Sequence, residues 1–135
     1  MSSPAFALQD AMRTALLAHA PLVVLLQGHN IFDEVPRGAN APHVSFGDIE
    51  TRDWSVAGQT AHEHFVTLQV RTNQRGRKLA QDIVSEIETA LDDAALSLVG
   101  HVLVNLRLTL WTVAHDKNSE NYGATMRFRA ATEPQ

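Results

Sequence analysis

Two alternating segments in the last third of the chain most constrain its fold. In the first, the apolar row is Val102, Val104, Leu106, Leu108 and Leu110, and the intervening residues are Leu103, Asn105, Arg107, Thr109 and Trp111. The second row follows the polar segment 116–121 and consists of Tyr122, Ala124, Met126, Phe128 and Ala130. A period of two residues is typical of β-strands, and a short polar connection joins antiparallel neighbours. We therefore expect a β-hairpin that turns both apolar rows towards a core.

Helical patterns elsewhere supply a layer to cover that hairpin. Ser3 and Pro4 form a helix start, because serine caps the first turn and proline has no N–H to leave unpaired there. Apolar residues then recur at helical spacing up to Leu16. The clearest helix covers residues 79–91, after the basic residues at 75, 77 and 78. Residues 21–26 form a short second helix or a turn.

Three further segments read as strands, over residues 30–35, 43–49 and 62–72. Residues 50–60 read as a long exposed connection. The order of helix, strands, helix, strands predicts an α+β fold. We expect an antiparallel or mixed sheet of about 4–5 strands, with two main helices packed on one face. Residues 1–135 are expected to form a single domain.

Composition excludes several classes of function. The 135 residues include no cysteine, so disulfides, thiolate metal sites and a cysteine nucleophile are absent. No apolar run approaches the roughly 20 residues that cross a bilayer, and we expect no membrane partner and no targeting segment. Fifteen acidic residues against eleven basic ones give a net charge of −4, which disfavours tight binding to nucleic acid phosphates.

Motifs for catalysis are lacking. The pair His62 and His64 would share one face of a strand and could bind a metal ion, with Asp48, Glu50 or His43 as a third ligand. Two solvent-facing histidines explain the same pattern, and no H-E-x-x-H motif accompanies them. Nucleophile-elbow and phosphate-binding motifs do not occur either. We therefore predict no catalytic, cofactor-binding or metal-binding residues, and a small metal-dependent enzyme that uses these histidines remains an alternative.

Two tryptophans point to interfaces. Trp54 follows Arg52 and Asp53 in the connection, where nothing local buries it. Exposed aromatic residues beside arginine are common anchors of protein interfaces, although Trp54 could also fold onto its own core. Trp111 lies among the residues that alternate with the Val102–Leu110 row, which makes both faces of that strand apolar. A partner subunit would cover the second face.

Short motifs spread along the chain resemble a known family. They are the segments 31–36 (IFDEVP), 41–44 (APHV), 53–55 (DWS), 64–70 (HFVTLQV), the helix over 76–91, and 122–130 (YGATMRFRA). In this order they resemble the small phage tail-completion family, and the tail terminators of siphophages and gene transfer agents. The resemblance covers nearly the whole chain and brings no catalytic motif with it.

The resemblance implies a structural virion protein that acts as a tail terminator. Such proteins form a ring, expected to be a hexamer, that caps the tail tube, stops its growth and joins the head-side connector. The implied partners are further copies of the chain, the tail tube protein, the connector or stopper, and double-stranded DNA that passes through the lumen without specific binding. The implied location is the tail–neck region of a particle assembled in the bacterial cytoplasm, whether an infectious phage or a gene transfer agent. A head–tail stopper or adaptor is the nearest alternative.

Overall fold

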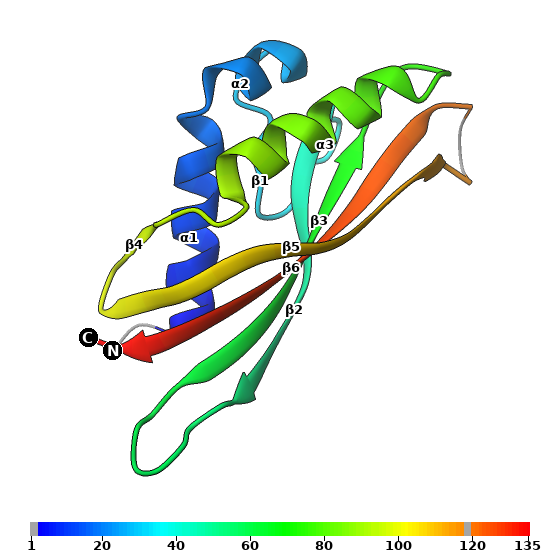
Figure 1. The fold of residues 1–135 in the computed structure, drawn as a ribbon. Coiled ribbons are helices and arrows are strands. Elements are labelled where there is room, and N and C mark those ends of the chain that lie inside the picture. Colours follow the sequence, from blue (N-terminus) through cyan, green and yellow to red (C-terminus); the bar gives the residue numbers. More distant parts are fainter. Residues whose placement is uncertain (1–2, 118–119) are drawn as a thin grey trace.

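The structure, a computed structural model, describes residues 3–117 and 120–135, which contain three helices and six strands (Figure 1). The helices are α1 (Pro4–Leu17), α2 (Ala20–Leu26) and α3 (Lys78–Leu91). The strands are β1 (Ile31–Phe32), β2 (His43–Asp53), β3 (His62–Arg71), β4 (Ser97–Leu98), β5 (His101–His115) and β6 (Tyr122–Pro134). The polar segment 116–121 includes residues 118 and 119, which lie outside the described residues.

The six strands form one mixed sheet in the order β1–β2–β3–β6–β5–β4. β1 runs parallel to β2, and each of the other neighbouring pairs is antiparallel. The hairpin predicted at the end of the chain is β5–β6, and β6 lies between β5 and β3. The long strands twist strongly along their length (Figure 1). Their ends therefore reach past the helices in two directions.

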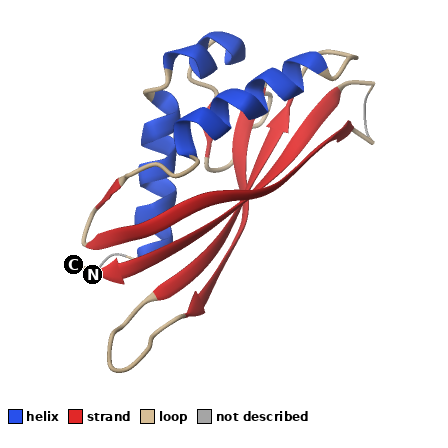
Figure 2. Cartoon of the chain, in the orientation of Figure 1, coloured by secondary structure: helices blue, strands red, loops and turns tan. Residues whose placement is uncertain are grey.

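The helices pack on one face of the sheet, and in the part of the chain that the structure describes no helix covers the other face (Figure 2). The core lies between these two layers. It includes Leu8, Met12 and Leu16 from α1, Ile83, Ile87 and Leu91 from α3, and Val66, Leu68, Met126 and Phe128 from the sheet. Burial of this apolar surface is the main force that holds the layers together. The opposite face, called the outer face below, is left open for contacts.

The helix signals in the sequence are confirmed at the atomic level. Ser3 Oγ accepts a hydrogen bond from the Phe6 N–H (3.3 Å), and Pro4 begins α1. The basic residues at the start of α3 oppose the helix dipole, so they need other partners. Lys78 donates to Asp82 at 2.8 Å, and the Arg77 guanidinium lies 4.8 Å from the centre of the aromatic ring of residue 122.

The α+β fold, the mixed sheet and the helices on one face are confirmed, with differences in detail. All five predicted strands are present, and the sixth, β4, has only two residues. The expectation of an exposed connection from residue 50 was wrong, because β2 continues to Asp53. The polar residues Glu50 and Arg52 are compatible with a strand here because their side chains lie on the open outer face, where they are exposed.

The predicted inward row of β5 was right for Leu106 and Leu108 and wrong for Val102, Val104 and Leu110. The pairing of β5 with β6 shifts register between Leu103 and Asn105 and again between Leu108 and Leu110. Each bulge adds a residue to one strand, so the alternation changes face. The residues that share the helix-covered face with the buried row of β6 are Leu103, Leu106, Leu108, Trp111 and Val113. Val102, Val104 and Leu110 are left 47, 47 and 58% exposed.

Candidate assembly interface

The β2–β3 hairpin presents Arg52, Asp53 and Trp54 at an end that projects beyond the helices (Figure 1). The Trp54 N–H donates to the Ala61 carbonyl at 2.9 Å, so strand pairing continues one step past Asp53. Every residue from 51 to 60 is exposed. The three residues predicted from the sequence therefore lie together on a protruding hairpin.

Hydrogen bonds hold the tip of this hairpin in one shape. The Asp53 carboxylate accepts from the Ser55 N–H (3.0 Å), and bonds from Ser55 hold the pKa of Asp53 below its usual range. Ser55 Oγ in turn accepts from the Ala61 N–H at 3.1 Å. Val56 and Gln59 exchange two backbone hydrogen bonds, of 3.0 and 2.9 Å, across the turn. The tip is thus a structured projection that can bind a partner without first being ordered.

Trp54 lies against the outer face and outside the hydrophobic core. Its side chain is 42% exposed, and the Arg129 guanidinium carbon lies 5.2 Å from its ring centre. Arg129 is itself held by Glu63 at 2.6 Å and by Asn105 at 3.2 Å. One side of the indole is therefore supported by a fixed cation, while much of the ring remains free to contact another molecule.

A second aromatic residue, Phe65, occupies the same face between two arginines. The guanidinium carbons of Arg52 and Arg127 lie 5.2 and 5.8 Å from its ring centre. Arg127 also pairs with Glu50 at 3.2 Å. Arg52 also lies 3.8 Å from Glu50, so the two arginines share one carboxylate, which offsets part of their positive charge and weakens the face as a phosphate site. Its chemistry suits another protein surface better than a polyanion.

Trp111 lies far from this group in the sheet. It is 48% exposed and shares the helix-covered face with the buried Met126, its neighbour on β6. The strands β6 and β3 separate β5 from β2. Trp111 and the group of Arg52, Asp53 and Trp54 therefore belong to two different sides of one molecule.

The pair His62 and His64 does not form a metal site. His64 is fully buried, and its two ring nitrogens each lie 2.9 Å from a threonine hydroxyl, those of Thr51 and Thr132. Burial, with His62 nearby, lowers the pKa of His64 to about 4. Glu50 faces Arg127 on the outer side instead. Among the described residues, no three His, Asp or Glu side chains gather in a way that could hold a metal ion.

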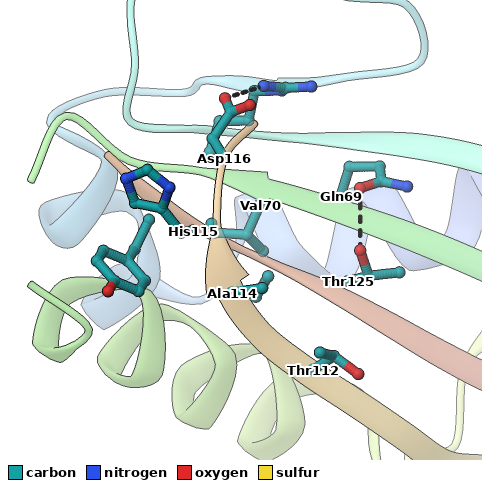
Figure 3. A pocket seen from close by; sticks show the side chains of 11 residues that line it. Gln69, Val70, Thr112, Ala114, His115, Asp116 and Thr125 are labelled. Atoms are coloured by element: carbon teal, nitrogen blue, oxygen red, sulfur yellow. Dashed lines mark hydrogen bonds and ion pairs between the residues drawn. The ribbon is translucent and has the colours of Figure 1, made fainter. Parts of the chain in front are cut away.

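A small hollow lies at the other end of the outer face (Figure 3). It measures about 150 Å³, and its lining includes Gln69, Thr125 and Asp116. Gln69 and Thr125 hydrogen-bond each other at 3.2 Å, and Asp116 forms an ion pair with Arg71. Ligand sites usually occupy 300 Å³ or more, so this hollow has room for little beyond water. Its polar groups bind each other rather than converge on a ligand.

Comparisons with known proteins place the chain in a family. The model of the family "Tail completion protein gp17" matches residues 10–133. The chain belongs to this family. Tail completion proteins are structural proteins of phage tails. No curated protein matches the chain.

Two solved structures resemble this tail completion protein over nearly its whole length. One is a chain in the virion of a native gene transfer agent particle, with 28% identity and a TM-score of 0.89, covering 98% of this chain and 99% of that one. The other is the gp17 protein of bacteriophage SPP1, with 23% identity and a TM-score of 0.63, covering 93 and 88%. The second likeness supports the fold alone.

The interface residues expected from the sequence lie on the exposed surface of this tail completion protein. Sequence patterns pointed to Trp54 and Trp111, both of which are half-exposed. They missed Phe65 and Arg129, because the alternation of β3 and β6 does not say which outward residues meet across strands. The exposed position of Leu110 was missed because a bulge leaves no signal in the apolar pattern.

Proposed function

We propose that this protein is a tail terminator. Its copies form a ring, expected to be a hexamer, that caps the tail tube. One observation carries the proposal: the 28% identity and 0.89 TM-score with a chain of a native gene transfer agent virion, end to end in both chains. Residues 1–135 are proposed to act as one domain.

In this role the ring binds the last ring of tail tube subunits and stops further growth. Its opposite side binds the head-side connector or stopper, in the tail–neck region of a particle assembled in the host cytoplasm. Double-stranded DNA passes through the lumen. A net charge of −4 on each copy supports passage without binding, because an acidic ring attracts phosphates weakly.

The exposed residues on the two sides of the sheet are proposed to make the contacts. Arg52, Asp53 and Trp54 project on the β2–β3 hairpin, and Trp111 lies on β5. Half-exposed tryptophans give a large contact area for little loss of side-chain freedom, which is why they often anchor interfaces.

Labelling of the particle tests the location. The chain has no cysteine, so the exposed Gln81 on α3 can be changed to cysteine and labelled with maleimide-linked gold. The label is expected at the junction between tail and head. Label along the tube or at its distal tip would contradict the proposal. Label at the junction, together with tails of normal length when the gene is absent, would favour the stopper or adaptor instead.

A further inference from the structure

The side of β5 that faces away from β6 is covered only over the first half of the strand. β4 pairs with its first two residues, and the turn after α3 then continues the cover. The Asp93 N–H donates to the Leu106 carbonyl at 2.8 Å, and the Leu108 N–H donates to the Asp92 carboxylate at 2.9 Å. Beyond Leu108, no strand among the described residues pairs with this side of β5.

The hydrogen-bond pattern shows which groups point to that open side. The Tyr122 carbonyl accepts from the Thr72 N–H, so the even-numbered residues of β6 bond towards β3 and the odd-numbered ones towards β5. Residues 110, 112 and 114 of β5 pair with those odd-numbered residues. The backbone N–H and C=O groups of Trp111 and Val113 therefore point to the open side.

The other side of the sheet has an open edge as well. β1 pairs with β2 only as far as Ser45, and the structure describes no strand beside the rest of β2. The bond from the Trp54 N–H to the Ala61 carbonyl fixes the alternation of β2 against β3. The residues whose backbone N–H and C=O groups point away from β3, towards the open edge of the sheet, are accordingly Ile49, Thr51 and Asp53.

The two edges differ in charge. From residue 108 to residue 115 the chain has no Asp, Glu, Lys or Arg, and Leu110 and Trp111 are 58 and 48% exposed. Edge strands are usually protected by charges, proline or a covering segment, and beyond its bulge this one has none of these. The β2 edge carries three acidic residues, Asp48, Glu50 and Asp53, against one basic residue, Arg52, and is therefore net negative. Two β2 edges would repel each other, whereas β2 beside the uncharged β5 edge would not.

We propose that β5 of one copy pairs with β2 of the next copy, which joins their sheets edge to edge. The inference rests on the proposed ring and names the strands that build it. Because the two edges are different, the contact is head-to-tail, the kind that can close into a ring. It also brings the β5 edge around Trp111 of one copy beside the β2 edge of the next, two edges that stand apart within a single chain.

Cysteine crosslinking in isolated particles tests the pairing. Arg52→Cys on β2 and Thr112→Cys on β5 are both exposed, and the chain has no other cysteine. With a short bismaleimide, the double variant is expected to give a ladder of covalent oligomers, and each single variant only monomer. Product from Thr112→Cys alone would show β5 against β5 and overturn the proposal. The proposal would also be overturned if the double variant is incorporated into particles and gives no crosslinked product. The variant Gln81→Cys serves as the control that measures the background of nonspecific crosslinking.

A proline on the open edge gives an independent test. The Val113 N–H points away from β6, so Val113→Pro removes a donor to the neighbouring copy and no hydrogen bond of its own sheet. Incorporation into particles is expected to fall at least about tenfold, while Val113→Thr, which keeps the N–H, incorporates normally. Full incorporation of the proline variant would contradict the pairing. If the proline variant does not fold, Trp111→Lys replaces it, because it places a charge on the same edge. Loss of incorporation is again expected, and full incorporation would again contradict the pairing.

Complementation separates this proposal from the proposed function. A variant gene that restores normal tails, while its cysteines give no covalent product, contradicts the strand pairing alone. Normal tails in the complete absence of the gene contradict the terminator role itself.

Discussion

His64 makes the stability of this protein depend on pH in a way that can be measured. The imidazole is fully buried between β2 and β6, with one nitrogen 2.9 Å from the Thr51 hydroxyl and the other 2.9 Å from that of Thr132. A neutral imidazole has one donor and one acceptor nitrogen, so it can satisfy both threonines. Burial, and the proximity of His62 and His101, lower its pKa to about 4.

The direction of the effect follows from comparison with the unfolded chain, in which histidine has its ordinary pKa of 6.5. As the pH falls below 6.5, the unfolded state binds a proton that folded His64 does not, so stability is lost until the pH reaches about 4. Between pH 7.5 and pH 4.5 this residue alone should lower the free energy of unfolding by about 2.5 kcal/mol. The buried His43, whose pKa is also lowered, acts in the same direction.

Urea unfolding at the two pH values measures this loss. His64→Gln keeps a donor and an acceptor for the two threonines but does not titrate, so its pH dependence should be smaller by about 2.5 kcal/mol. His43→Gln serves as the matched control for the second histidine. Asp53 and Asp92 have lowered pKa values, so their contributions are lost mainly as the pH falls through 3.8 and change little in this range. If His64→Gln loses as much stability as the parent chain between these pH values, the reasoning is refuted.

Three further predictions concern the hairpins. Ala57 has a φ of +51° beside Gly58 at +81°, so Ala57→Asn should raise the free energy of unfolding by about 1 kcal/mol; an unchanged melting temperature would contradict the strain. A Cβ at Gly123 would lie 2.5 Å from the Val70 carbonyl oxygen, so Gly123→Ala should cost about 1–3 kcal/mol in urea unfolding, and a neutral result would show that β6 can shift. Trp54→Ala should change stability by less than about 1 kcal/mol and yet fail to enter particles; an unfolded variant would make Trp54 a residue that supports the fold.

Local patterns predicted the helices and most strands because each of those signals is contained within a few residues. Ser3 and Pro4 begin α1, and α3 ends at Leu91, the last residue of the helix predicted there. β4 was missed because two residues carry no periodicity. The length of β2 was missed because Arg52 and Asp53 are polar, and only the pairing with β3 shows that polar residues suit the open face.

The candidate interface was harder to predict, for a physical reason. Trp54 could be recognised as exposed because its own neighbours are charged, but its support by Arg129 depends on a contact between residues 75 positions apart. Trp111 was recognised as a surface residue, yet the face assigned to it was wrong, because two bulges in β5 change the register. That these residues occupy opposite edges of one sheet follows only from the strand order.

The most direct test of the central claim is electron microscopy of particles produced without this gene. The terminator role predicts overlong tail tubes beside DNA-filled heads that carry no tail, and rescue of both defects when the gene is restored. Tails of normal length that fail to attach would assign the protein to the head side of the joint, and normal particles would contradict a role in tail completion.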